Sequence, residues 1–198
     1  CTEIHYDTGD DDAGTPTLED FETGRVVEIW NNVFMQFNRH PDGTLESLPK
    51  PSVDTGMGLE RLATIMQGQN SNYHTDLFLP MLEKVSVLSK KEYRRTDDED
   101  DVSMRVIADH ARATVFLVAD GIQPSNEGRG YVMRRIMRRA IRHGHRLGLE
   151  DLFFHQVCDV VVNIMGEAYP ELVDARELIS KVAQLEETNF RRTLSTGL

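Results

Sequence analysis

The stretch DTGMGLERLATIM, residues 54–66, combines a glycine-rich turn with the beginning of a helix. Its apolar residues at positions 59, 62, 63 and 66 have helical spacing, and Asp54 or Thr55 is well placed as the helix N-cap. The glycines at 56 and 58 allow a flat base or a phosphate to approach the backbone, while the helix N-terminus and Arg61 favour negative charge. The stretch is compatible with a nucleotide site, although a glycine-rich turn before a helix is more often just a turn.

Upstream of this stretch the sequence predicts a β-hairpin. RVVEIWNNVFMQF at residues 25–37 is rich in β-branched and aromatic residues and contains no breaker, which favours a long strand. The sequence HPDG at 40–43 is a turn signal, and residues 44–48 form a plausible return strand. A further short strand is expected at 2–6, a loop at 7–17, and a proline-rich connector at Pro49 and Pro51.

From about residue 75 onward the sequence has helical periodicity throughout. The acidic run DDEDD at 97–101 is interpreted as a solvated linker that also favours the N-terminus of the next helix. We therefore expect an α+β chain, with an antiparallel sheet and one helix in residues 1–75 and an all-helical domain in residues 76–198. The expected helices of the second part are 76–88, 102–119, 130–147, 151–167 and 171–196.

The composition is that of an ordinary globular protein, with 39% hydrophobic and 28% charged residues among 198. No apolar run approaches the roughly 18 residues that a membrane span needs, and no signal peptide is recognisable after Cys1. Cys1 and Cys158 form neither a disulfide framework nor a metal cluster, so a reducing, cytoplasmic location is expected. Because the sequence lacks an initiator Met, we expect it to begin inside a longer chain.

The net charge of −11 argues against a nucleic-acid partner, but the charge is unevenly distributed. Residues 128–149 contain seven arginines and no acidic residue. Within YVMRRIMRRAIRHGHRL, residues 131–147, apolar pairs and arginine pairs recur every four positions, so the arginines form a stripe beside an apolar stripe. This stripe is equally consistent with phosphate binding and with an amphipathic helix whose arginines pair with acids elsewhere.

Two polar residues interrupt the apolar strand predicted at 25–37. Glu28 and Asn31 offer carboxylate and amide oxygens, which are hard ligands suited to the Mg²⁺ that nucleotide chemistry commonly requires. Positions three apart on a regular strand face opposite sides, so both can reach one ion only across a bulge or a strong twist. The alternative is that Glu28 faces solvent and Asn31 caps a local turn.

Four motifs follow one another along the chain: EIWNNVFMQF at 28–37, PKPSVDTGMGLER at 49–61, RVIADH at 105–110 and ADGIQPSNEGRGY at 119–131. Together they closely resemble alanyl-tRNA synthetases, which are class II aminoacyl-tRNA synthetases, and the resemblance covers nearly the whole chain. It implies an internal piece of such an enzyme. Residues 1–75 would be the C-terminal part of the catalytic domain, with the third class II motif at 56–61, and residues 76–198 the helical tRNA-recognition domain.

The resemblance implies a set of functional residues for ATP and alanine. Arg61 would contact the terminal phosphate of ATP as the catalytic residue, while Glu28 and Asn31 would hold Mg²⁺ with ATP. Asp54, as a buried carboxylate, would bind the α-ammonium group of alanine, and Val33 would limit the pocket near the methyl group. The implied ATP-binding residues are Glu28, Ile29, Asn31, Gly56, Gly58 and Arg61, and the implied alanine-binding residues are Asp54, Val33 and Gly56.

The resemblance also favours contact between the basic helix and the acceptor stem of tRNA(Ala), mostly through arginine–phosphate pairs. Asn126 would read a wobble base pair near the end of that stem, and a role as an Asx-turn or N-cap is compatible with this reading. Asp109 and His110 look like a catalytic pair but are assigned to structure, because adenylation needs only positioning and charge. The implied tRNA-binding residues are Asn126, Arg129, Arg134, Arg135, Arg138, Arg139 and Arg142.

The rest of the parent chain is an expected partner, because two of the three class II motifs would lie upstream of Cys1 and an editing domain downstream. A pocket that admits a methyl group cannot strongly reject glycine, which explains why such enzymes edit. The parent would activate alanine with ATP and transfer it to the 3′ end of tRNA, whereas this chain alone is expected to be inactive. Two other classes stay open: a non-catalytic RNA-binding module and a helical scaffold without a ligand.

Overall fold

The computed structural model describes residues 1–10 and 13–196, which fall into two compact units. The first unit is Cys1–Thr75, and the second begins at Asp76. The first contains a three-stranded antiparallel sheet with short helices, and the described residues of the second contain helices but no strand. The α+β class predicted from the sequence is confirmed.

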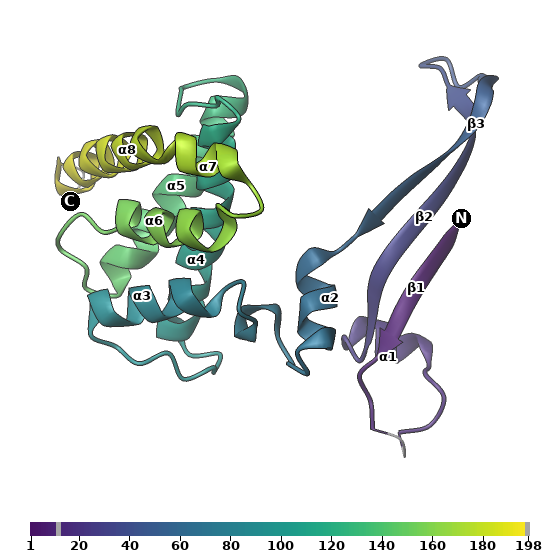
Figure 1. Ribbon diagram of the computed structural model, residues 1–198, viewed down its shortest axis with the longest axis horizontal. Helices are drawn as coiled ribbons and strands as arrows, with labels where there is room; N and C mark the ends of the chain where they lie inside the picture. Colours follow the sequence, from purple (N-terminus) through teal and green to yellow (C-terminus); the bar gives the residue numbers. More distant parts are fainter. Residues whose placement is uncertain (11–12, 197–198) are drawn as a thin grey trace. The chain divides into compact units, whose positions relative to one another are not determined.

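The sheet consists of β1 (Thr2–Asp7), β2 (Val26–Arg39) and β3 (Leu45–Met57), in the order β1-β2-β3 (Figure 1). The β-branched and aromatic residues of β2 suit a pleated surface. A tight turn joins β2 to β3, in which the Gly43 N–H donates to the His40 carbonyl oxygen at 2.9 Å. The strands predicted at 2–6 and 25–37 and the hairpin between β2 and β3 are confirmed.

The proline-rich connector expected at Pro49 and Pro51 is wrong, because β3 continues through both prolines. The return strand predicted at 44–48 is therefore only the first part of β3. The pairing register shifts between Met35 and Phe37, so several residues of β3, including both prolines, lie opposite a single residue of β2. Among the described residues β3 is also an edge strand, which pairs with β2 alone. Proline cannot donate a ladder hydrogen bond, and bulges and edge strands are the places that tolerate it.

Helix α2 (Leu59–Met66) follows directly on β3 and has Gly58 at its N-cap position. The cap predicted at Asp54 or Thr55 is wrong, because both residues belong to β3 and pair with β2. The strand continues to Met57 and turns into the helix at the next residue. The short helix α1 (Leu18–Glu22) and the 3-10 turn η1 (Asn72–His74) were not predicted.

In the second unit, α4 contacts each of the other helices. The predicted segments are found within a few residues, except that 171–196 is two helices. Pro170 begins α7, which buries Leu172, and the chain turns at Ala175 before α8. Ala175 has nearly helical dihedrals (φ −86°, ψ −1°), so the periodicity of the sequence continues across the break. The helices are α3 (Leu79–Ser89), α4 (Glu99–Ala119), α5 (Gly128–Arg146), α6 (Phe154–Met165), α7 (Pro170–Asp174) and α8 (Arg176–Thr196).

The solvated interpretation of the acidic run at 97–101 holds for Asp97, Asp98 and Glu99, which are exposed, but is wrong for Asp101, which is fully buried. Its carboxylate accepts hydrogen bonds from the backbone N–H groups of Arg94, at 3.1 Å, and Thr96, at 2.7 Å. Burial by itself would raise the pKa of Asp101, but these hydrogen bonds outweigh it and hold the pKa below its ordinary value. The second half of the interpretation is confirmed, since three of these acids lie in the first turn of α4.

Buried apolar side chains are concentrated in the second unit. Val26 is the one buried apolar residue described before Phe78, whereas Phe34, Phe37 and Val53 of the sheet are more than half exposed. Amides of α4, α5 and α6 should therefore exchange with solvent on the order of 100-fold more slowly than those of the sheet in this chain. Hydrogen exchange followed by mass spectrometry measures the difference, and equal protection of the two units would contradict this prediction.

Candidate functional site: the bulged strand pair and the arginine helix

The pairing between β1 and β2 contains a bulge at Ile29. Ile4 pairs with Trp30, whereas the next residue, His5, pairs with Glu28, so Ile29 is an extra residue of β2. The Ile29 carbonyl oxygen accepts a hydrogen bond at 3.0 Å from the backbone N–H at the N-cap of α2. The bulge predicted between the two polar residues of this strand is therefore confirmed, and it is tied to the beginning of the helix.

The bulge and the register bring five of the predicted site residues to one face of the sheet. An extra residue shifts the alternation of a strand by one, so Glu28 and Asn31 project from the same side. Asn31 pairs with Gly56, and Val33 pairs with Asp54. Because alternate residues of a strand share a face, β2 and β3 together place all five groups on the side of Glu28.

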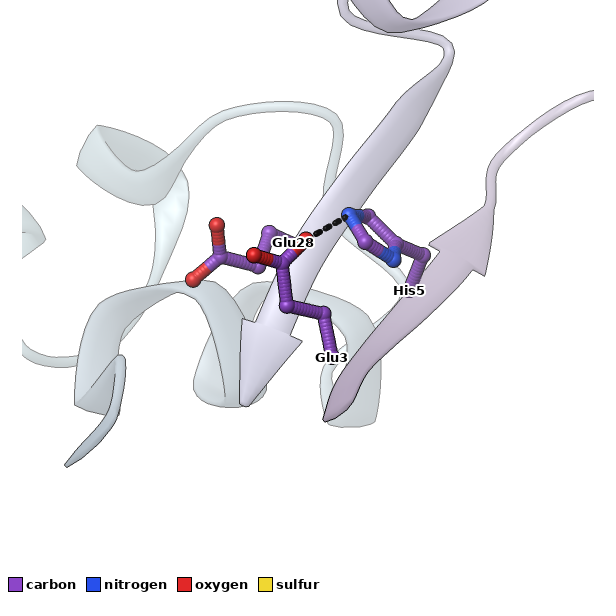
Figure 2. Close-up of side chains that lie close together, drawn as sticks. All are labelled: Glu3, His5 and Glu28. Atoms are coloured by element: carbon purple, nitrogen blue, oxygen red, sulfur yellow. Dashed lines mark ion pairs between the residues drawn. The ribbon is translucent and has the colours of Figure 1, made fainter. Parts of the chain in front are cut away.

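Two further polar residues of β1 lie on this face. Glu3 and His5 are two positions apart on the strand, and Figure 2 shows them gathered with Glu28 at the β1–β2 pair. One ligand atom from each of the three residues lies within 4.8 Å of the others, and His5 Nε2 is 3.5 Å from Glu3 Oε2. Sequence reasoning missed Glu3 and His5. Their alternation was visible in the sequence, but their meeting with Glu28 depends on the pairing register.

Of the two polar atoms of the Asn31 side-chain amide, the nitrogen makes a hydrogen bond and the oxygen does not, among the described residues. Its Nδ2 donates to Glu3 Oε1 at 3.3 Å, and its Oδ1 is buried without a hydrogen-bond partner among the described residues. An orphaned acceptor beside two carboxylates is a costly arrangement unless a cation or a donor satisfies it. The oxygen donors of Glu3, Glu28 and Asn31 fit Mg²⁺, which prefers hard oxygen ligands, and the nitrogen of His5 does not add to that fit.

The two glycines beside this face differ in what surrounds them. A Cβ added at Gly56 would meet no atom within 4 Å, so nothing in this chain requires a glycine there, and the surface above it is open. A Cβ added at Gly58 would lie 3.3 Å from Cδ of Arg61, so Gly58 lets that side chain fold closely across the backbone. The open surface at Gly56 suits the close approach of a flat ligand.

Arg61 is exposed and turned toward the backbone of β2. Its Nη1 donates to the Glu28 carbonyl oxygen at 2.7 Å. It also lines a cavity of about 620 Å³ together with Tyr6 and Val27. These two residues pair with each other and are the neighbours of His5 and Glu28 in their strands, so they project from the opposite face of the sheet. The structure thus brings Arg61 to the backbone of Glu28 but not to the carboxylate.

The expectation that Asp54 is a buried carboxylate is wrong, because Asp54 is exposed in this structure, as Val33 is at 37%. Asp54 lies on β3, the edge strand, and the face of the sheet above it carries no covering layer among the described residues of this unit. The register still places it opposite Val33 and two residues from Gly56.

The arginines of α5 divide into two groups with different surroundings. Arg134 and Arg138 are partly covered, with side-chain exposures of 22% and 34%, and both lie against Glu186 of α8, whose side chain is 5% exposed. The exposed arginines of the predicted tRNA-binding set are Arg129, Arg135, Arg139 and Arg142. The interpretation of pairing with an acid therefore applies to Arg134 and Arg138, while phosphate binding by the exposed arginines stays a prediction.

Three of the exposed arginines, Arg135, Arg139 and Arg142, line a cavity of about 490 Å³ on the second unit. Its lining also contains His110 of α4 and Phe190 of α8. Burial, followed by the positive charges of Arg146 and Arg139, lowers the pKa of the neighbouring His143. A local excess of positive charge is thus present in a chain whose net charge is −11. Such a surface attracts phosphate groups.

Asn126 is exposed, whereas His110 is partly buried. Asn126 lies in the turn that precedes α5, and Nη1 of Arg134 donates to its Oδ1. His110 Nδ1 lies 2.8 Å from Oδ2 of Asp109, its neighbour in the sequence. Asp109 and His110 belong to α4 in the second unit, whereas the bulged strand pair belongs to the first.

Comparison with known proteins identifies the family of this chain. Over residues 1–198 the chain matches the family described as tRNA synthetases class II (A). The chain belongs to the class II tRNA synthetases. In this class II synthetase chain, the bulged strand pair and the arginine helix are parts of one matched region.

Curated relatives of this class II synthetase chain carry the name alanine–tRNA ligase. The chain is 54% identical over 199 aligned residues to the protein of Francisella philomiragia and 58% identical over 208 to that of Anaeromyxobacter dehalogenans, covering 100% of this chain in both cases. It spans only 22% of the length of either relative. Among its described residues, no helix is both long and apolar enough to cross a bilayer.

Proposed function

We propose that this chain forms, within an alanine–tRNA ligase, part of the site that makes alanyl-adenylate and the surface that holds the acceptor stem of the tRNA. The observation that carries the proposal is the bulge at Ile29, which places Glu28 and Asn31 on the same face as Asp54 and Gly56. A regular strand would have separated the two Mg²⁺ ligands. Alanine-dependent ATP–pyrophosphate exchange tests this part of the proposal.

In the first half-reaction, a carboxylate oxygen of alanine attacks the α-phosphorus of ATP, and the bond to the β-phosphate breaks to release pyrophosphate. Glu28 and Asn31 would hold Mg²⁺, which when bound would neutralise phosphate charge. Gly56 and Gly58 lie against the adenosine, and the backbone at Ile29 approaches the ribose. Arg61 contacts the terminal phosphate, for which it exchanges its bond to the Glu28 carbonyl oxygen for bonds to phosphate oxygens.

Alanine is recognised at the neighbouring positions of the same face. Asp54 pairs its carboxylate with the α-ammonium group of the substrate, and Val33, directly opposite in the register, limits the space for the side chain. The open surface at Gly56 completes this pocket. Because Asp54 is exposed in this structure, binding of the substrate or another part of the enzyme must cover it for the ion pair to be strong.

In the second unit, the exposed arginines Arg129, Arg135, Arg139 and Arg142 bind phosphates of the acceptor stem, together with the more covered Arg138. These contacts position the stem but carry no sequence information. Asn126 lies exposed in the turn before the same helix and reads a base pair. Its amide can address a base edge in the shallow minor groove of RNA.

Asn126→Ala in a full-length enzyme that contains this chain should lower kcat/KM for an acceptor-stem hairpin with the wobble pair. The decrease should correspond to a loss of roughly 1–3 kcal/mol of transition-state stabilisation. The decrease in kcat/KM should be far smaller for a hairpin in which a Watson–Crick pair replaces the wobble pair. Arg139→Ala should instead weaken binding of both hairpins about equally and lower the salt dependence by about one unit of slope. Aminoacylation kinetics with two hairpins and two variants measure both effects. Equal losses for Asn126→Ala on the two hairpins would remove base reading from Asn126.

A further inference from the structure

All three guanidinium nitrogens of Arg134 lie against other groups of the protein. Its Nη1 donates to Oδ1 of Asn126, and its Nη2 donates to the carbonyl oxygen of Pro124 at 3.3 Å. Its Nε lies 3.4 Å from Oε2 of Glu186, which is an ion pair without a hydrogen bond. One guanidinium therefore joins the turn before α5 to an acid of α8. These contacts occupy the fork that a phosphate would need.

Glu186 is a fixed anchor for this guanidinium. Its side chain is 5% exposed, and its other oxygen, Oε1, accepts a hydrogen bond from Nε of Arg138 at 2.7 Å. Arg138 in turn lies over the ring of Phe190, with 5.1 Å between its Cζ and the ring centroid. A buried carboxylate hydrogen-bonded to Arg138 has little freedom to move, so Arg134 pairs with a negative charge of fixed position.

The contact with Arg134 determines which way the Asn126 amide faces. An arginine only donates hydrogen bonds, so the amide atom that faces it must be the oxygen. The amide nitrogen, Nδ2, then points away from Arg134 on an exposed residue. Asn126 consequently presents two N–H donors outward, and it can recognise an acceptor such as O2 of a pyrimidine or N3 of a purine.

The turn that carries Asn126 is fixed to the helix independently. The Ser125 N–H donates to the Gly130 carbonyl oxygen at 3.1 Å, and Ser125 Oγ donates to the Glu127 carbonyl oxygen at 2.7 Å. A Cβ on Gly130 would lie 2.3 Å from Gln123 O, so only glycine allows this close approach. The backbone of the turn is held by these contacts, and the orientation of the Asn126 side chain is left to Arg134.

We propose that Arg134 is a positioning residue rather than a phosphate contact: anchored by Glu186, it holds the Asn126 amide with its NH₂ group outward, as the donor that reads an acceptor on the base pair. This inference rests on the proposed function of Asn126 and specifies its chemistry. It removes Arg134 from the phosphate-binding set expected from the resemblance, and it adds Glu186, which sequence reasoning did not select.

The first test concerns the free chain and uses no RNA. Side-chain ¹⁵N relaxation of Asn126 should show an ordered amide in the wild type and a mobile one in Arg134→Lys, because a single ammonium group cannot span Asn126, Pro124 and Glu186. Arg135→Lys, which changes an exposed neighbour on the same helix, serves as the control and should leave Asn126 ordered. An Asn126 amide with the same order in Arg134→Lys as in the wild type would overturn the proposal.

The second test uses the full-length enzyme and the ratio of kcat/KM for two acceptor-stem hairpins, one with the wobble pair and one with a Watson–Crick pair. Arg134→Lys should reduce this ratio about tenfold, although the positive charge is kept. Arg135→Lys should leave the ratio unchanged. Lysine can still bind phosphate as a point charge. An unchanged ratio for Arg134→Lys would therefore show that Arg134 contacts the RNA backbone or serves only folding, and it would overturn the inference.

A third variant separates this inference from the function on which it rests. Asn126→Asp keeps the acceptor for Arg134 but removes the outward donors, so it should lose discrimination between the two hairpins as Asn126→Ala does. If Asn126→Ala left the ratio unchanged, the proposed base reading by Asn126 would fail, while the relaxation measurement would still decide whether Arg134 orders the amide. If Asn126→Asp kept full discrimination, the donor assignment would be wrong.

Discussion

Arg61→Ala should slow alanine-dependent ATP–pyrophosphate exchange by about 100-fold or more in a full-length enzyme that contains this chain. The departing pyrophosphate gains negative charge as its bond to the α-phosphorus breaks, and a guanidinium stabilises that charge with two parallel hydrogen bonds. Arg61 is exposed in the first turn of α2, and its bond to the Glu28 carbonyl oxygen is one that a phosphate can replace. The initial exchange rate at saturating alanine and ATP measures the effect.

The matched control for this prediction is Arg39→Ala, which removes an exposed arginine at the opposite end of β2 and should leave the exchange rate nearly unchanged. Arg61→Lys should recover only a small part of the loss, since an ammonium group cannot make the two parallel bonds. An exchange rate for Arg61→Ala within a few-fold of the wild type would remove Arg61 from the catalytic assignment.

Glu28→Gln should likewise reduce pyrophosphate exchange by about 100-fold at ordinary Mg²⁺ concentration, because an amide oxygen binds a hard divalent cation much more weakly than a carboxylate does. Raising the Mg²⁺ concentration should restore part of the rate, which a purely structural defect would not allow. Titration of the exchange rate with Mg²⁺ in wild type and variant measures this shift.

Glu46→Gln is the control for the metal assignment. Glu46 also lies on the strand pair, but near the hairpin turn, where its Oε2 lies 2.8 Å from Nε2 of His40. Its substitution should leave the Mg²⁺ dependence unchanged. If Glu28→Gln lost activity with the same Mg²⁺ midpoint as the wild type, Glu28 would act on the sheet and not on the ion.

Those parts of the fold that rest on local chemistry could be predicted from the sequence. β2 was predicted because thirteen residues without a breaker favour a strand, and α2 because its apolar residues recur with helical spacing. The bulge at Ile29 could also be predicted, since Glu28 and Asn31 can share an ion only if the alternation shifts between them. In each case the deciding residues are close together in the chain.

The errors lie where distant segments decide the outcome. Pro49 and Pro51 look like a connector, and only the register of β3 against β2 shows that a bulge in an edge strand holds them. Ala175 ends a helix although its own dihedrals are nearly helical, so no periodicity marks the break before α8. Asp101 was read as part of a solvated run because its acceptor role depends on the folding of the preceding loop over α4.

In the candidate site, too, features that depend on local sequence could be predicted, and features that depend on distant segments could not. Glu28, Asn31 and Gly56 could be selected as candidates because each stands out within its own segment. Glu3 was missed because only the register brings it to Glu28. The division of the arginines was not predictable either, since Glu186 lies 48 residues beyond Arg138 and no local pattern connects them.

The central claim is that the bulge at Ile29 makes Glu28 and Asn31 act on one Mg²⁺, and a double-mutant cycle on pyrophosphate exchange tests it most directly. Glu28→Gln, Asn31→Ala and the double variant are compared at several Mg²⁺ concentrations. Shared coordination predicts that the double variant loses much less than the product of the single losses, with a coupling of about 1 kcal/mol or more. Losses that multiply at every Mg²⁺ concentration would show two independent residues and would contradict the account.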